Sequence, residues 1–253
     1  MCKPIQLLIL DAPATGDLPE ADVLRKAGFD PVIHQVFPGQ VGFEQALAEA
    51  DVLLTLHSDI DGEMLKKAER CQIVMHYGPG SGGDVARIDL PTARRLGIYV
   101  ASIPDWAAGD WADRTMDLMD QLFNHRPIPS RTGRKPSLKK LRLGLVGLGC
   151  VGREVARRAA RREMDVWACD PFTETEYFFT LDVHSVDLDE LFGICDIISL
   201  HVPLGPATRG LVNRRRLNLL KRGSLLVNIS SPELVELDAL PMALERNRPA
   251  GAA

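Results

Sequence analysis

The sequence feature that most constrains the fold is a glycine-rich turn between a short apolar run and a helical pattern. Leu143 to Val146 form the apolar run, and Gly147, Gly149 and Gly152 follow it at the spacing G-x-G-x-x-G. Such glycines permit a tight turn, close approach of the backbone to a pyrophosphate, and tight packing of helix on strand. A helix that begins near residue 151 directs free N–H groups at the phosphates. The turn therefore predicts a dinucleotide-binding unit.

An acidic residue follows this turn at the distance that ribose recognition requires. A second predicted strand, 164–168, leads into Cys169 and Asp170, and Asp170 lies 18 residues after Gly152. A carboxylate there accepts hydrogen bonds from the adenosine ribose and repels a 2′-phosphate, which favours NAD over NADP. The strand, the helix and the acid together argue against a mere glycine-rich surface turn beside an exposed aspartate.

Two more predicted strands, 196–200 and 224–228, are expected to end at the same edge, because ligands bind at the carboxyl ends of such sheets. His201 follows the first strand, and Asn228 ends the second. A histidine there is either a catalytic acid/base or a residue that packs on the cofactor or caps backbone, and the second role is the more common.

Alternating strand and helix patterns predict an α/β chain with parallel sheets covered on both faces. The pattern predicts strands at 5–10, 31–36, 52–56, 72–75, 97–101, 142–146, 164–168, 196–200 and 224–228, and helices near 20–27, 42–50, 61–69, 91–96, 108–123, 151–162, 212–220 and 236–245. These strands are too many for one sheet, so two sheets are expected. Segment 125–140 has three prolines, six Arg or Lys and no acid, which predicts a solvated connection between them.

Bulk properties exclude several classes of protein. A formal net charge of −4 gives no electrostatic case for nucleic acid or an anionic membrane. The five cysteines are scattered without a CxxC pair, which favours reduced thiols in the cytoplasm over disulfides or a zinc site. No apolar run reaches the length of a membrane span, and the N-terminus predicts a first strand rather than a signal peptide.

Several motifs together resemble the D-isomer-specific 2-hydroxyacid dehydrogenases. The cofactor half carries GLGCVG (147–152), CDP (169–171), SLHVPLGPATRGLVN (199–213) and LLVNISSPELVELDALPMALERNRPAGAA (225–253). Looser matches in the other half are MHYGPG (75–80), RIDLPTARRLGIYVASIP (87–104) and GDWADRTMDLM (109–119). The sequence around Gly78-Pro79-Gly80 most resembles the branch with phosphoglycerate dehydrogenase-like and C-terminal-binding-protein-like members.

This resemblance implies two Rossmann-like domains. Residues 1–104 would form a flavodoxin-like substrate-binding domain. Residues 105–253 would form the NAD-binding domain, with the bridging helix and the linker. The cofactor would be NAD, the substrate a small 2-hydroxy or 2-keto acid and the assembly a homodimer, in the cytoplasmic location that the cysteines predict.

By motif position, the resemblance also assigns residues to the two ligands. Cys150 and Val151 would lie at the pyrophosphate, Asp170 at the ribose, and His76, Tyr77 and Gly78 at the substrate carboxylate. The remaining cofactor-lining positions would be Gly147, Gly149, Gly152, His201, Val202, Pro203, Thr208, Asn228, Ile229 and Ser230.

The chain departs from the family pattern in three places. Ser231 stands where the family has an arginine that grips the substrate carboxylate, and Pro232 stands at a glycine position. Segment 81–86 carries extra residues, and the sequence stops at Ala253 before the family's glutamate and histidine acid/base pair. The sequence therefore predicts no catalytic residue and a second domain of four clear strands, truncated, with 224–228 as an unpaired edge that invites association.

Three interpretations of function follow. The chain is an NAD-dependent 2-hydroxyacid oxidoreductase with impaired turnover, an NAD(H)-binding sensor or regulatory partner without turnover, or a decayed gene product. The cofactor motif favours the first, whereas Ser231 and the abrupt end favour the other two.

Overall fold

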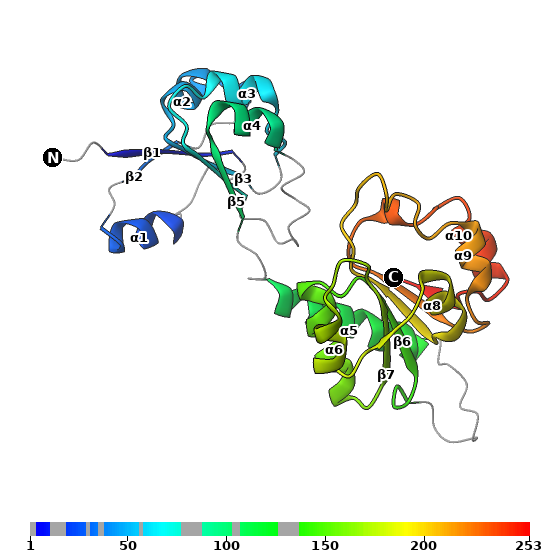
Figure 1. Cartoon of the computed structure of the whole chain (residues 1–253). Helices are drawn as coiled ribbons and strands as arrows, with labels where there is room; N and C mark the ends of the chain where they lie inside the picture. Colours follow the sequence, from blue (N-terminus) through cyan, green and yellow to red (C-terminus); the bar gives the residue numbers. More distant parts are fainter. Residues whose placement is uncertain are drawn as a thin grey trace. The chain divides into compact units, whose positions relative to one another are not determined.

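The computed structural model describes residues 4–10, 19–28, 31–34, 38–55, 58–76, 88–102, 107–125 and 137–253. The chain divides into two compact units, Met1–Pro104 and Asp105–Ala253. Each unit carries its own parallel sheet with helices on both faces, which confirms the predicted α/β class (Figure 1). None of the helices in the described ranges is long and apolar enough to span a membrane.

The first unit has a five-stranded parallel sheet in the order β2-β1-β3-β4-β5, which is the flavodoxin-like order. Its elements are β1 Ile5–Ile9, α1 Pro19–Lys26, β2 Pro31–His34, α2 Phe43–Glu49, β3 Val52–Thr55, α3 Gly62–Lys67, β4 Ile73–His76, α4 Leu90–Leu96 and β5 Tyr99–Ser102. Helices α2, α3 and α4 cover one face and α1 the other (Figure 1). Apolar side chains on both faces of β1 and β3 explain why these strands are central.

The second unit has a six-stranded parallel sheet in the order β11-β10-β9-β6-β7-β8. Its elements are α5 Ala108–His125, β6 Arg142–Val146, α6 Cys150–Arg161, β7 Asp165–Cys169, α7 Thr175–Thr180, β8 His184–Ser185, α8 Leu188–Ile194, β9 Ile197–Leu200, α9 Arg214–Leu219, β10 Leu225–Asn228, the 3-10 turn Pro232–Leu234, α10 Leu240–Glu245 and β11 Gly251–Ala252. Counted from β6, this is the doubly wound dinucleotide-binding order, which reverses between β6 and β9.

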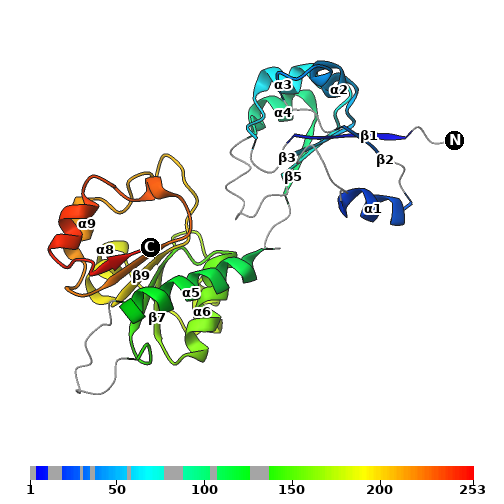
Figure 2. The same ribbon diagram turned by 180° about the vertical axis from the view of Figure 1, so that it is seen from behind.

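Two apolar layers enclose this sheet. Helices α5 and α6 cover one face, and α8, α9 and α10 cover the other (Figures 1 and 2). All four residues of β9 are buried: Ile197 belongs to the α5/α6 layer, whereas Ile198 and Leu200 belong to the opposite layer. An interior parallel strand is apolar on both faces for this reason.

The expectation that strand 224–228 forms an unpaired edge is wrong. β10 pairs with β9 on one side and with β11 on the other, through Leu225–Gly251 and Leu226–Ala252. The backbone N–H of Asn228 also donates to the Ala253 carbonyl at 2.7 Å. The sheet therefore has six strands rather than four, because the short strands β8 and β11 close its two sides.

The helix predictions for the second unit also need correction. Helices α7 and α8 were not predicted, and the helix expected at 236–245 begins only at Leu240. Pro232 starts a separate 3-10 turn ahead of it, and the next helix has its own proline, Pro241, in its first turn. Proline fits the first turn of a helix because its missing N–H is not needed there, so each proline marks a new start.

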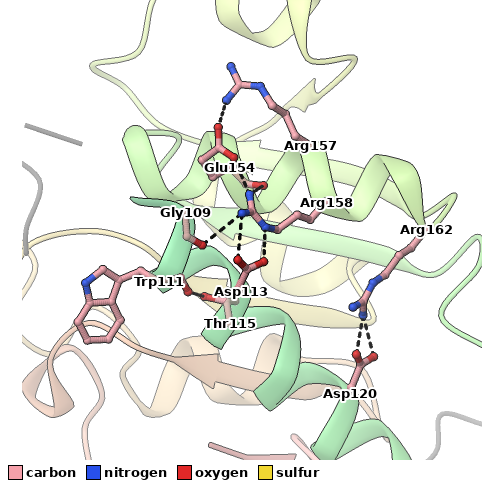
Figure 3. Close-up of polar contacts among 9 residues, drawn as sticks. All are labelled: Gly109, Trp111, Asp113, Thr115, Asp120, Glu154, Arg157, Arg158 and Arg162. Carbon is pink, nitrogen blue, oxygen red and sulfur yellow. Dashed lines mark hydrogen bonds and ion pairs between the residues drawn. The ribbon is translucent and has the colours of Figure 1, made fainter. Parts of the chain in front are cut away.

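Arginines of α6 fasten α5 to the second unit (Figure 3). The Arg158 guanidinium bonds Asp113 at 2.7 Å, the Gly109 carbonyl at 3.3 Å and Glu154 at 2.5 Å. One helical turn on, Nη1 of Arg162, the C-cap residue of α6, donates to both carboxylate oxygens of Asp120 at 2.8 and 2.7 Å. The guanidinium of Arg158 lowers the pKa of the Asp113 carboxyl, so this acid is committed to the helix pair. Helix α5, the bridging helix of the sequence analysis, thus packs on α6 as part of the second unit.

Candidate functional site

Four strands of the second unit end level with one another at one edge of the sheet. Val146 at the end of β6 pairs with Cys169 of β7 and with Leu200 of β9, and Leu200 pairs with Asn228 of β10. The loops that follow these four residues carry nearly all the predicted cofactor-binding positions. The sheet register brings them to the carboxyl edge at the point where strand order reverses, which is where ligands bind in this type of sheet.

The first and third glycines of the turn are required by packing. Gly147 has φ +96, and a Cβ on it would lie 2.6 Å from the His201 carbonyl oxygen. A Cβ on Gly152 would lie 2.3 Å from the Gly147 carbonyl oxygen. Both distances are far below contact, so only glycine lets β6, α6 and the loop after β9 approach this closely.

Gly149 lacks a side chain for a different reason. Its backbone is extended, with φ −70 and ψ −161, a conformation open to any residue. A Cβ on Gly149 would meet no protein atom within 4 Å. Packing therefore does not explain this glycine. The space beside its backbone is open to a ligand.

The helix behind Gly149 leaves its positive end without a side-chain partner. Gly149 is the N-cap of α6 and supplies no capping hydrogen bond, and the first turn holds no acidic residue. Cys150 and Val151 occupy the first two helical positions and are half-buried. An uncapped N-terminus with this polarity attracts an anion.

Asp170 is tied to the glycine turn by its carboxylate. One oxygen accepts the Leu148 N–H at 2.7 Å, and the other accepts those of Phe172 at 2.9 Å and Thr173 at 3.2 Å. The Thr173 hydroxyl donates back to the Leu148 carbonyl at 3.3 Å. An ionised carboxylate has about four acceptor positions, so one is left for an incoming hydroxyl. The negative charge is thus fixed next to the glycine turn.

His201 lies beneath the glycine turn and is buried. Its backbone N–H donates to the Val146 carbonyl at 2.8 Å, and its ring nitrogen Nε2 lies 2.9 Å from the Ser199 hydroxyl. Its Nδ1 is buried and has no hydrogen-bond partner. Burial lowers the pKa of the His201 imidazole to about 4, so the ring is neutral near pH 7. This arrangement favours the packing role over the acid/base role.

The loop after His201 is closed by its own hydrogen bonds. Val202 lies against Gly147, since its Cγ1 is 2.9 Å from the position of a Cβ there. The Thr208 hydroxyl donates to the Pro203 carbonyl at 2.6 Å and accepts the Gly205 N–H at 2.8 Å. A hydroxyl has one proton, so that of Thr208 is used to hold the loop.

The segment Asn228 to Ser231 forms a turn stapled by the Asn228 side chain. Its amide donates to the Ser231 carbonyl at 2.8 Å and accepts the Ser230 N–H at 3.0 Å. The Ser230 hydroxyl donates to the Leu200 carbonyl at 3.1 Å, which joins this turn to β9. Ile229 packs on the α5/α6 layer. The turn therefore forms one wall at the carboxyl edge.

The Ser231 hydroxyl is directed at a carboxylate and not at open space. It donates to Glu233 in a short hydrogen bond, which lowers the pKa of the Glu233 carboxyl. Glu233 is exposed and ionised at neutral pH. The position where the family resemblance predicts a cation therefore carries a neutral donor beside a negative charge.

The predicted substrate residues are only partly described. His76 is the last residue of β4 and is buried, and it pairs in register with Thr55 and Ser102 at the carboxyl edge of the first sheet. Tyr77 and Gly78 lie outside the described residues. The described part of the chain contains no cluster of side chains suited to a metal ion, and no disulfide joins its cysteines, Cys71, Cys150, Cys169 and Cys195.

Sequence reasoning missed two residues at the glycine turn. Thr173 joins the turn at residues 170–173, called the acidic turn, to Leu148. The Arg153 Nε donates to the Gly149 carbonyl at 3.2 Å. The motif itself holds no signal for Thr173. Arg153 carries one, because a long cation one residue after the third glycine lies a single helical turn from the phosphate-binding backbone.

A sequence model of the family described as D-isomer specific 2-hydroxyacid dehydrogenase, NAD binding domain, matches residues 111–253. The chain belongs to this family. The D-3-phosphoglycerate dehydrogenase of Methanocaldococcus jannaschii is 31% identical over 226 residues, which cover 83% of this chain and 41% of the relative. The Synechocystis protein of the same name is 30% identical over 250 residues, 92% of this chain and 44% of the relative. The chain thus spans less than half the length of both.

Solved structures are similar across nearly the whole chain. A D-lactate dehydrogenase from Aquifex aeolicus, solved with NAD and lactic acid, has a TM-score of 0.73 and 25% identity, and the match covers 97% of this chain and 75% of that one. A Thermus thermophilus protein, TT0316, has a TM-score of 0.75 and 28% identity over 95% of this chain and 78% of that one. These matches confirm the two-sheet fold of the family.

The first prediction concerns the buried imidazole of His201. Its ordinary pKa in an unfolded chain is about 6.5, so the unfolded state binds more protons between about pH 4 and 6.5. Stability is therefore full above pH 6.5 and falls as the pH drops through this window, by ~3 kcal/mol at most. His201→Gln removes this slope. All three tryptophans lie in residues 105–253, so urea unfolding followed by tryptophan fluorescence measures it.

The exposed His184 is the matched control for this prediction, and His184→Gln is expected to keep the slope. An unchanged pH dependence in His201→Gln would show that folding does not lower the pKa of the imidazole.

Proposed function

We propose that Asp105–Ala253 binds NAD(H) at the carboxyl edge of its sheet, as the cofactor half of a 2-hydroxyacid oxidoreductase. The observation that carries this proposal is the open space at Gly149, next to two glycines that packing demands. The uncapped end of α6 and the fixed charge of Asp170 support it. When bound, the nicotinamide supplies or accepts a hydride. In this chain, the glycine turn would hold the pyrophosphate and Asp170 the ribose.

The first unit, Met1–Pro104, is proposed as the substrate-binding domain. His76 at the end of β4 supports this, because it is a buried titratable group at the carboxyl edge of the first sheet. Known relatives and the family resemblance favour a small 2-hydroxy or 2-keto acid as substrate. The homodimer and the cytoplasmic location stay predictions.

Cofactor choice tests the proposal directly. NADH is expected to bind at least tenfold more tightly than NADPH, because the Asp170 carboxylate repels a 2′-phosphate. Asp170→Asn keeps an oxygen that accepts backbone N–H bonds but removes the charge. The ratio of NADH affinity to NADPH affinity is therefore expected to decrease in this variant. Calorimetric titration of both cofactors into both proteins measures this. Equal affinity of the unmodified chain for NADH and NADPH would contradict the assignment.

A second candidate function is NAD(H) binding without efficient turnover, and the Ser231–Glu233 pair favours it. A substrate carboxylate gains most from a guanidinium, which offers two parallel charged hydrogen bonds. At this position, Ser231 offers one neutral donor that is already bonded, and Glu233 adds a like charge. Loss of a positioned charge-stabilising donor commonly costs 10²–10³ in rate.

The expected result is little or no reduction of glyoxylate, pyruvate or hydroxypyruvate by the unmodified chain with NADH. The double variant Ser231→Arg/Glu233→Gln is expected to lower the calorimetric Kd for pyruvate in the presence of NADH about tenfold or more, because the guanidinium no longer pairs with Glu233. Ser231→Arg alone is the control, with a smaller effect. A clear steady-state rate from the unmodified chain would show that another residue, such as His76, performs the proton transfer.

A further inference from the structure

The arginines of α6 and its C-cap residue, Arg162, differ in what they contact, and Arg161 is exposed without a carboxylate partner among the described residues. Arg157, Arg158 and Arg162 all pair with carboxylates of α5 or α6, as Figure 3 shows. Arg153, at the start of the same helix, has no carboxylate partner among the described residues. Arg153 is half-buried, so its charge is neither neutralised by an acid nor freely solvated. An unpaired cation in this position calls for an anion.

Two contacts fix where the Arg153 guanidinium lies. Its Nε donates to the Gly149 carbonyl at 3.2 Å, which folds the side chain back toward the N-terminus of α6. Its Cζ lies 4.3 Å from the centre of the Tyr177 ring, on α7. A guanidinium above an aromatic ring is held by cation–π attraction. The Nε donates to Gly149 and the guanidinium contacts the Tyr177 ring, whereas the terminal nitrogens Nη1 and Nη2 have no hydrogen bond to the described residues and remain as donors.

We infer that Arg153 binds the cofactor pyrophosphate and supplies the positive charge that the glycine turn itself lacks. This inference rests on the proposed function, because it needs a dinucleotide at Gly149. The residues at the first two helical positions, Cys150 and Val151, carry no cation, so the backbone and the helix dipole alone would face two phosphate charges. Arginine matches phosphate with paired charged hydrogen bonds, and Arg153 is held one helical turn from the site.

The 2′-phosphate of NADP is the competing anion, and the charge of Asp170 argues against it. The Asp170 carboxylate is fixed on Leu148 at 2.7 Å, next to the Thr173 turn. A 2′-phosphate near that carboxylate would meet a like charge, whereas the pyrophosphate meets the uncapped helix end and Arg153. Tyr177 has a positioning role in this inference, because its ring contacts the guanidinium and so holds Arg153 near the glycine turn.

The test compares Arg153→Gln with Arg161→Gln, an exposed arginine in the last turn of the same helix that matches the loss of charge. Calorimetry is expected to show NADH binding roughly 10- to 100-fold weaker in Arg153→Gln, and unchanged in Arg161→Gln. ADP-ribose, as a competitor of NADH, is expected to weaken in parallel, whereas adenosine, which has no phosphate, is not. Arg153→Lys is expected to bind NADH more tightly than Arg153→Gln but less tightly than the unmodified chain, because lysine keeps the charge without the paired donors of a guanidinium.

The positioning role of Tyr177 has its own measurement. Tyr177→Leu is expected to weaken NADH binding several-fold in the unmodified background and to have no further effect in Arg153→Gln. Thermal unfolding without ligand checks that each variant folds. If Arg153→Gln does not fold, the salt dependence of NADH binding is compared between Arg153→Lys and the unmodified chain instead.

Each outcome separates the inference from the proposed function. NADH binding that is equally tight in Arg153→Gln overturns the role of Arg153 and leaves the function standing. Weakening of NADPH alone means that Arg153 reads the 2′-phosphate, which also overturns the inference. No binding of NADH by the unmodified chain overturns both.

Discussion

The contact between three backbone segments at the glycine turn is the constraint on which the second unit depends. The turn after β6 lies against the carbonyl of His201 and beneath the first turn of α6, at distances where no Cβ fits on Gly147 or Gly152. This contact sets the height of α6 above the sheet and brings its N-terminus to the carboxyl edge. Every other feature of the site, including the loop after β9 and the acidic turn, is arranged around it.

Charge placement at this edge is asymmetric, and the asymmetry has functional consequences. Near the glycine turn, the uncapped helix end and Arg153 are positive, and the single acid, Asp170, is fixed by three backbone N–H bonds. At the Asn228–Ser231 turn, Ser231 lies beside the negative charge of Glu233. In the proposed function, the glycine turn would hold the dinucleotide, and the charge of Glu233 would disfavour a substrate carboxylate.

The sequence allowed the glycine turn, Asp170 and the two-sheet class to be predicted, because these rest on short-range patterns with strict spacing. It did not predict that β11 forms, since Gly251 and Ala252 are small residues at the start of an expected strand and become one only by pairing with β10. Nor did it reveal that Thr208 and Asn228 use their polar groups within their own loops. Those bonds depend on loop conformation, which long-range packing decides, and the same is true of the contact between Arg153 and Tyr177.

The central claim is that Gly149 is a glycine because a ligand lies against it. Its backbone accepts any residue, and a Cβ there touches no protein atom within 4 Å. Aspartate is a favourable N-cap residue, so Gly149→Asp is expected to leave the ligand-free unfolding temperature unchanged or higher. Its charge would occupy the proposed phosphate site, so calorimetry is expected to show no measurable NADH binding. NADH binding as tight in Gly149→Asp as in the unmodified chain would contradict the account.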